Sequence, residues 1–294
     1  GIQYALDGRD DDQRDITQSH DFLFFNPKAG IHYALNQYGS IYAGFAVANR
    51  EPNRDNYTDA DPSKPAPVAE TLFDYELGYN YHKNNLKLAA NLYYMHYRDQ
   101  LVLTGAINDV GAPVMTNVPL SFRTGLEISS QYMLTENLQA SANLTVSSNK
   151  IKNFTEYVDD WDNWGSQIEN SIGSTDIAFS PDMVAGAAIN WAIIKNLDLM
   201  INGKYVSRQY IDNTSSPDRS LEPYFVSNLR LGYTVKPAFV RQIEFSLNIN
   251  NLFNAEYETN AWIYRYYSEG TYGVLDGFFP QAGINFMAGL TLKL

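Results

Sequence analysis

Apolar and polar residues alternate one by one over long stretches of the chain. At residues 284–294, every second residue is apolar, from Ile284 through Phe286 to Leu294, and polar Asn285 and Lys293 lie between them. Successive side chains of a β-strand point to opposite faces of a sheet, so this period of two indicates a strand with one apolar face. The same alternation predicts strands at 86–94, 138–146 and 243–249.

The predicted strands are joined alternately by short turns and long loops. Short turns are expected at 36–39, 82–85, 135–138, 195–196 and 236–241. Long polar loops are expected near 9–21, 51–69, 105–114, 153–173, 211–222 and 256–280. With a partial strand at 2–6, this organisation gives about twelve long antiparallel strands. Strands of soluble sandwiches usually have about 5–6 residues, whereas membrane-spanning strands need about 9–11. The sequence therefore predicts an all-β protein that forms an antiparallel transmembrane β-barrel.

The two faces of the predicted strands differ sharply in polarity. The apolar face is expected to meet lipid, and the polar face is expected to line the lumen, where its charges would find partners in one another, in water or in a plug. The charged residues predicted on the lumen face are Glu76, Arg123, Glu127 and Arg230. A soluble barrel or sandwich would show the same alternation with its apolar face turned inward, because the pattern does not say which face meets water.

Aromatic residues favour the membrane interpretation. One stands on the apolar face shortly before each of five short turns, at Tyr33, Tyr81, Tyr132, Trp191 and Tyr233. Aromatic rings that have a polar edge and an apolar edge collect at lipid–water boundaries, where they all lie at the same depth in the membrane. Aromatic residues of a protein core would not need this common height.

The charge distribution agrees with a protein that separates two compartments. The net charge is −12, the long loops are acidic and the short turns together are weakly basic. Such an acidic chain lacks the basic footprint that nucleic-acid binding requires. The chain contains no cysteine, which excludes disulfides and thiolate metal sites, and no apolar run long enough for a transmembrane helix. No basic segment followed by an apolar one suggests a signal peptide, and no cofactor is expected.

Two long loops carry the strongest candidates for ligand binding. Loop 153–170 combines two indole rings with three aspartates, at Trp161, Trp164, Asp159, Asp160 and Asp162. Carboxylates at this density could bind Ca²⁺, although the spacing of an EF-hand is missing, and a solvated acidic loop is the alternative. Loop 257–280 carries Trp262, Tyr264, Arg265, Tyr266, Tyr267 and Tyr272. Aromatic rings beside an arginine suit ligand capture, while packing of one loop against another is the alternative.

No arrangement of residues indicates an enzyme. The four histidines are scattered, and no two stand at the spacing of metal ligands. His96 has the parity of the lipid face, as the histidine of a barrel lipase would, but no serine and carboxamide converge with it. We therefore expect no catalytic residues.

Several segments are similar in order and character to one known family. They are "YELGYNY" (75–81), "NLYYMHYRDQLVLTG" (91–105), "NVPLSFRTGLEISSQY" (117–132), "SPDMVAGAAINW" (180–191) and "FSLNINNLFNAEYETN" (245–260). Together with the terminal alternating strand, they resemble the C-terminal half of TonB-dependent outer-membrane receptors. The resemblance covers essentially the whole chain.

This resemblance implies that residues 1–294 are the C-terminal portion of a 22-stranded barrel in the outer membrane of a Gram-negative bacterium. The implied partners are the TonB complex, recruited by a missing N-terminal region, the plug domain, the remaining barrel strands, the bilayer with its lipopolysaccharide, and a small-molecule or metal-chelate ligand. The implied function is uptake of a scarce nutrient complex with energy from TonB. An iron–siderophore complex is the commonest substrate, and cobalamin, other metals and glycans stay open. The alternatives are a self-contained twelve-stranded channel or passive pore, and a soluble β-rich binding module.

Overall fold

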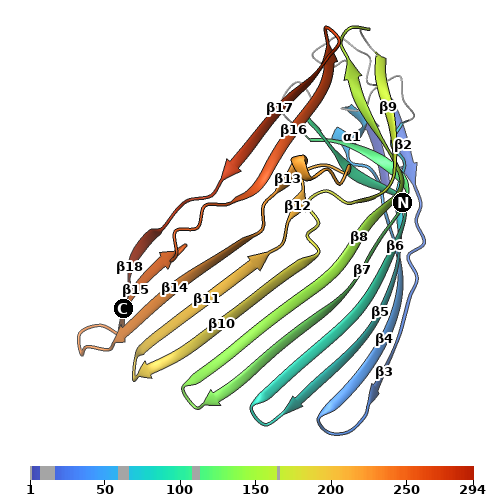
Figure 1. Cartoon of the computed structure of the whole chain (residues 1–294). Coiled ribbons are helices and arrows are strands. Elements are labelled where there is room, and N and C mark those ends of the chain that lie inside the picture. The colour runs from blue at the N-terminus through green and yellow to red at the C-terminus, as the bar shows by residue number, and fades with distance from the viewer. Residues whose placement is uncertain (1, 7–16, 59–65, 108–112, 164–165) are drawn as a thin grey trace.

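A computed structural model describes residues 2–6, 17–58, 66–107, 113–163 and 166–294. Eleven strands follow one another as antiparallel neighbours in a single curved sheet (Figure 1). They are β3 (Lys28–Ala34), β4 (Gly39–Arg50), β5 (Glu70–Lys83), β6 (Leu86–Ile107), β7 (Pro113–Thr135), β8 (Leu138–Asp160), β10 (Met183–Ile194), β11 (Leu197–Val206), β14 (Tyr224–Val235), β15 (Gln242–Asn250) and β18 (Asn285–Lys293). The predicted all-β antiparallel fold is confirmed.

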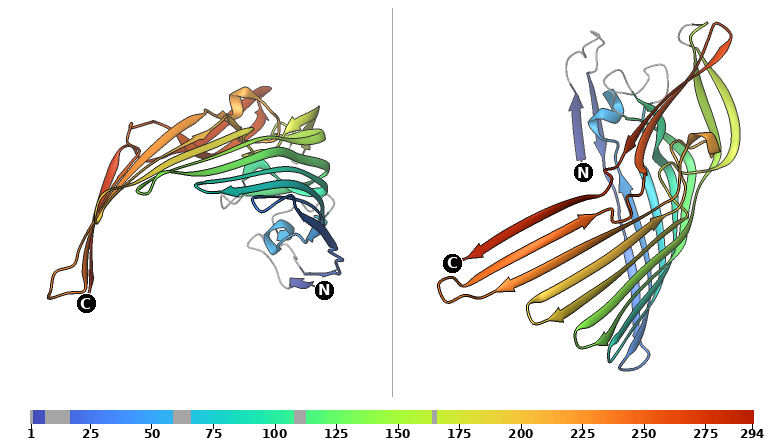
Figure 2. Two further views of the ribbon diagram at one scale, coloured as in Figure 1. Left: turned by 90° about the horizontal axis from the view of Figure 1, so that it is seen from below. Right: turned by 60° about the vertical axis from the view of Figure 1, so that its left-hand side comes forward.

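The sheet forms an open arc, seen from below in Figure 2. β3 and β18 stand at its two edges, and no pairing joins them within the described residues. The arc therefore corresponds to part of a barrel, and it does not support a twelve-stranded barrel that closes on itself. The predicted strand at 2–6 is present as β1 (Ile2–Leu6), but it pairs with β2 (Gln18–Phe22) in a separate sheet.

The short turns lie where the sequence predicts them. β5 and β6 are joined through Asn84, and β10 and β11 through Asn196, both with positive φ angles of 52° and 69°. Tight hairpins need positive φ, and asparagine adopts it more readily than most residues. The registers place the aromatic residues of the expected girdle close to these turns, with Tyr81 opposite Leu88, Tyr132 opposite Leu86 and Trp191 opposite Leu199.

No second layer of protein covers the apolar face of the sheet within the described residues. Leu77, Leu92 and Tyr94 keep between 42% and 52% of their surface exposed, although they stand in the middle of long strands. Other large side chains exposed on this face are Leu126, Tyr132, Val146, Ile189, Trp191, Ile201, Phe245 and Leu290. A soluble sandwich would bury such a face, whereas a membrane barrel presents it to lipid. This exposure resolves the ambiguity that alternation alone leaves.

Two of the expected long loops contain further paired strands. β8 continues to Asp160 and pairs with β9 (Ser166–Asp176), and the segment expected as a final loop forms the hairpin of β16 (Glu258–Ser268) and β17 (Thr271–Pro280). These extensions have polar residues on both faces, so the alternation that marks the other strands is weak there. The remaining elements are α1 (Arg54–Thr58), β12 (Gln209–Tyr210), η1 (Pro217–Arg219) and β13 (Ser220–Leu221).

Among the described residues, nine buried hydrophobic side chains form two small clusters. One contains Val102, Val118, Ile151, Phe154 and Ile177, and the other contains Ile211, Leu221, Ala261 and Ile263. Both are built from the ends of strands and from loops far from the short turns, where the chain folds over itself and can exclude water. No helix in the described part of the chain is long and apolar enough to cross a bilayer.

Candidate functional site

The tips of two hairpins meet at the end of the molecule opposite the short turns (Figure 1). β16 pairs in parallel with the end of β8, with Tyr266 opposite Asp159 and Tyr267 opposite Asp160. The amide of Trp161 donates a hydrogen bond of 2.8 Å to the carbonyl of Tyr267. The structure thus joins the acidic loop and the aromatic loop, which the sequence suggests as separate candidates, into one assembly.

The centre of this assembly is a group of three aromatic rings. Trp161 stacks on Tyr266 with 4.1 Å between ring centroids, and Tyr264 lies beside Tyr266 at 5.6 Å. The indole Nε1 of Trp161 donates to the hydroxyl of Tyr264, which donates in turn to Oδ2 of Asp159 at 2.6 Å. Trp161 remains 45% exposed. The group therefore offers a flat apolar surface to solvent, while the indole N–H of Trp161 and the hydroxyl of Tyr264 are satisfied by internal hydrogen bonds.

Burial and the hydrogen bond to Asp159 raise the pKa of Tyr264 from 10.0 to about 12. The neutral phenol is thus favoured in the folded state, so its stabilising contribution is complete below about pH 10 and is lost as the pH rises through about 12. In a pH titration of the full-length protein followed by phenolate absorbance, we expect one tyrosine to ionise well above pH 10. The variant Tyr264→Phe should lack this component of the titration. Tyr266→Phe is the control, because its hydroxyl makes no hydrogen bond among the described residues. Loss of a tyrosine that titrates near pH 10 in Tyr264→Phe would contradict this assignment.

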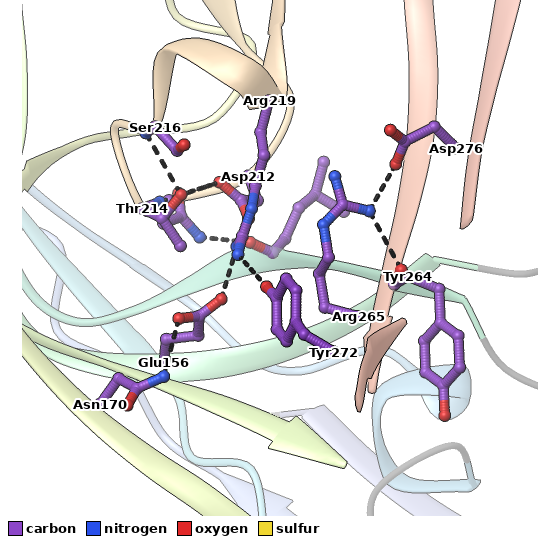
Figure 3. Close-up of polar contacts among 12 residues, drawn as sticks. Glu156, Asn170, Asp212, Thr214, Ser216, Arg219, Tyr264, Arg265, Tyr272 and Asp276 are labelled. Atoms are coloured by element: carbon purple, nitrogen blue, oxygen red, sulfur yellow. Dashed lines mark hydrogen bonds and ion pairs between the residues drawn. The ribbon is translucent and has the colours of Figure 1, made fainter. Parts of the chain in front are cut away.

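Arg219 connects the other face of the β16–β17 hairpin to the rest of the extracellular end (Figure 3). Its guanidinium donates to Glu156 at 2.5 Å, to Asp212 at 2.8 Å and to the hydroxyl of Tyr272 at 2.5 Å. These partners come from β8, from the loop before η1 and from β17. One arginine, whose side chain is only 12% exposed, therefore joins three separate segments.

The remaining aromatic-loop candidates act within the hairpin itself. Arg265 donates to Asp276 of β17 at 2.5 Å, and its side chain is only 8% exposed, so it is occupied by an internal ion pair. The rings of Trp262 and Tyr266 lie across Gly277 and Gly273, where a Cβ atom would collide with them. Tyr267 meets Tyr272 edge to face at 5.1 Å. Trp164 lies outside the described residues.

The three aspartates suggested for a metal ion do not converge. Asp159 accepts from Tyr264 and Gln167, while Asp160 accepts from the side chain of Asn163, and this hydrogen bond is the main cause of its lowered pKa. Asp162 accepts from the backbone amides of Glu269 and Gly270. No group of three or more side chains suited to a metal ion occurs in the part of the chain that the structure describes. Asp159 and Asp162 instead stabilise the contact between the two hairpin tips, and Asp160 stabilises the tip of its own hairpin.

Three of the four predicted lumen charges lie together. Glu76, Arg123 and Glu127 line one recess of about 330 Å³ on the polar face of the sheet. Arg123 donates to Ser180 at 2.8 Å. Arg230 lies elsewhere, on β14, and forms a loose pair with Glu244 at 3.9 Å.

The residues that organise the extracellular end, above all Arg219 with Asp212 and Glu156, are not predicted from the sequence. A lone arginine in an otherwise acidic loop is the only local signal, and it does not reveal partners as distant as Glu156. Tyr42 is not predicted either, and its hydroxyl donates to Asn91 at 3.1 Å on the lumen side.

The long antiparallel strands, the open curvature and the uncovered apolar face define an outer-membrane β-barrel. The chain matches the family described as TonB dependent receptor-like, beta-barrel, over residues 3–252. It belongs to this family of outer-membrane transport receptors of Gram-negative bacteria, and not to a family of enzymes.

Named relatives agree with this membership. The catecholate siderophore receptor Fiu of Escherichia coli K12 is 23% identical over 255 residues, which are 82% of this chain and 30% of the relative. The crystal structure of Fiu in its closed form has a TM-score of 0.65 at 19% identity, covering 92% of this chain and 35% of Fiu. The siderophore receptor PiuA of Acinetobacter baumannii has a TM-score of 0.65 at 19% identity over 90% of this chain and 35% of PiuA. The copper transporter OprC has a TM-score of 0.63 at 17% identity over 90% of this chain and 39% of OprC. The chain therefore spans about a third of the length of these proteins.

Proposed function

We propose that this chain is the C-terminal part of the barrel of an outer-membrane receptor that imports an iron–siderophore complex or a similar metal chelate, with energy from TonB. Membership of the TonB-dependent receptor family carries this proposal, and the names of the relatives support a metal chelate as the ligand. In this proposal, the missing part of the receptor supplies the plug, the TonB-recruiting segment and the remaining strands.

The aromatic surface at the hairpin tips is the proposed first contact for the ligand. Trp161 and Tyr266 present stacked rings at the solvent-exposed end of the barrel, and loops held over a rigid barrel are the usual place for recognition. Their exposed faces suit a ligand with flat apolar or aromatic groups. Arg265 is not offered as an anion-binding residue, because its guanidinium is already paired with Asp276.

The recess at Glu76, Arg123 and Glu127 is the proposed contact for the plug. The two glutamates form no ion pair within the described ranges, and a carboxylate that becomes enclosed needs a partner. Basic groups of a plug would neutralise them, while Arg123 would hold an acidic or carbonyl group of the plug.

Uptake of radioactive iron tests the proposed function. The full-length protein should restore uptake from at least one iron–siderophore complex to cells that lack their own receptors, and only in cells that contain TonB. Uptake that continues without TonB, or steady conductance of the purified protein, would instead indicate a passive pore.

Within that assay, Trp161→Ala with Tyr266→Ala should raise the concentration needed for half-maximal uptake at least tenfold, which corresponds to about 1.4 kcal/mol of binding energy. Point variants test the aromatic surface more specifically than deletion of 257–280, because the deletion would also remove Ala261 and Ile263 from their buried cluster. Val274→Ala is the matched control, since Val274 is exposed on the same hairpin. Unchanged uptake in the double variant, at equal amounts on the cell surface, would exclude the aromatic surface from ligand capture.

A further inference from the structure

The basic side chains of the extracellular end are neutralised by carboxylates of the protein itself. Within 150–182, 207–223 and 252–281, these side chains are Lys150, Lys152, Arg208, Arg219 and Arg265. All except Lys152 form an ion pair, and Arg219 binds two carboxylates at once, so its cluster keeps an excess negative charge (Figure 3). Lys152 lies over the ring of Phe122 on the outer wall, 5.3 Å from its centre. Among the described residues of these segments, no unpaired basic group is left at the hairpin tips.

Basic residues from earlier in the chain do not change this balance. Arg50 pairs with Glu70 at 2.9 Å, and Arg123 shares its recess with two glutamates. Arg54 stands on α1, in the connection between β4 and β5, and Arg98 lies over an aromatic ring of the outer wall. The aromatic surface of Trp161 and Tyr266 is therefore set in a region of negative charge.

Four carboxylates flank this aromatic surface. They belong to Asp159, Asp160, Asp162 and Glu269. None of them forms an ion pair among the described residues, and the three aspartates accept hydrogen bonds from uncharged donors instead. The hydrogen bond from Asn163 is the main cause of the lowered pKa of Asp160, so this carboxylate is ionised at neutral pH. The hairpin tips thus carry negative charge that the described protein does not neutralise.

This charge lies close enough to the rings to act on a ligand bound there. Nε1 of Trp161 is 3.1 Å from the hydroxyl of Tyr264, and that hydroxyl is 2.6 Å from Oδ2 of Asp159. The carboxylate is therefore nearer to the indole than the screening length, which is about 8 Å at physiological ionic strength. The faces of aromatic rings also attract cations, because their π-electrons make the face negative. Rings and carboxylates thus favour the same sign of ligand charge.

We propose that this aromatic surface selects a metal chelate of the ferric trihydroxamate class, with a neutral or positively charged outer face, against anionic chelates. Three hydroxamates balance the charge of Fe³⁺, whereas three catecholates leave a complex with three negative charges. A cationic substituent of the trihydroxamate would lie against the rings, and an anionic complex would be repelled by the carboxylates of the tips. This inference rests on the proposed function and deepens it, because membership of the family leaves the charge of the ligand open.

One linear ferric trihydroxamate, prepared in three forms, tests this selection. Its terminal amine is left free, acetylated or succinylated, which gives complexes of charge +1, 0 and −1 on the same scaffold. Quenching of tryptophan fluorescence measures the affinity of the full-length receptor in detergent for each form. Each unit of positive charge that is removed should weaken binding about threefold, as expected for a few carboxylates at about one screening length in water.

Removal of two carboxylates from the tips should reduce the selection. In Asp160→Asn with Glu269→Gln, the difference between the +1 and −1 forms should fall from about tenfold to about threefold. The matched control is Glu136→Gln with Asp198→Asn, which removes the same charge from exposed positions at the short turns and should keep the wild-type difference. Heat-modified electrophoretic mobility confirms that every variant is folded.

The outcomes separate this inference from the proposed function. Equal or tighter binding of the −1 form, an undiminished difference in the tip variant, or binding of none of the three forms would overturn the inference. TonB-dependent uptake of iron from a tris-catecholate complex in preference to the neutral form would also overturn it, while the proposed function would stand. Binding in the expected order of charge without TonB-dependent uptake would support the charge selection and overturn the proposed function.

Discussion

Replacement of Arg219 by methionine is expected to destabilise the extracellular assembly by about 3–5 kcal/mol, because it leaves buried charge without a partner. The side chains of Asp212 and Glu156 are 4% and 14% exposed, and both accept from Arg219. Burial alone would lower the pKa of Arg219, but its bonds to Glu156 and Asp212 raise the pKa overall. The guanidinium therefore stays charged. Methionine is shorter but also unbranched, so it removes the charge with a modest loss of volume.

Hydrogen exchange in the full-length protein measures this effect. The amides of β12, β13 and the β16–β17 hairpin should exchange faster in Arg219→Met, while those of the barrel strands β10 and β11 should not change. Arg208→Met is the matched control in the same segment. Arg208 pairs with Glu222 at 3.3 Å, and both side chains are largely exposed, so about 0–1 kcal/mol is expected. Equal effects of the two variants would show that Arg219 does not connect the three segments.

Substitution of Leu92 by arginine is expected to destabilise the barrel by about 2–4 kcal/mol, the cost of a charge near the middle of the lipid face. Leu92 stands opposite Leu77 on β5 and Leu126 on β7. It lies six residues after Leu86, where β6 begins, and a strand tilted by about 40° rises about 15 Å over that length. Its side chain is 51% exposed because no protein covers it. Lipid would surround the new guanidinium, except where the long side chain extends to water at the membrane surface.

Unfolding of the full-length protein in phospholipid vesicles by guanidinium chloride measures this cost. Ala89→Arg is the control on the same strand, because Ala89 lines another recess on the polar face, of about 940 Å³, and an arginine there would reach water. Its effect should stay below about 1 kcal/mol, as expected for a solvated surface substitution. If Ala89→Arg were the more damaging substitution, the assignment of the two faces would be reversed and the apolar stripes would face inward.

The positions of the barrel strands follow from local sequence. In β5 and β6, apolar side chains such as Tyr75, Leu77 and Leu92 occur at every second position. This period of two shows directly which face of the sheet each residue occupies. The hairpin turns are equally local, because Asn84 and Asn196 adopt the positive φ that a tight turn requires. Neither feature depends on a distant segment, so both can be predicted from short stretches of the chain.

The extracellular end could be predicted only as two candidate loops. The residues of the pairs Trp161–Tyr266 and Arg219–Glu156 are far apart in the sequence, and nothing near either residue specifies its partner. The acidic loop illustrates the consequence. Its aspartates suggest a cation site by composition, but Asp159 and Asp162 accept hydrogen bonds from the β16–β17 hairpin.

The sequence by itself therefore determines the strands, the turns and the two faces, because alternation and turn chemistry act between residues that are close along the chain. The tertiary structure decides which face is left without a protein partner, how the hairpins of β8–β9 and β16–β17 interlock, and which charges are neutralised. Those outcomes depend on contacts between segments whose relative positions are set by strand order and register.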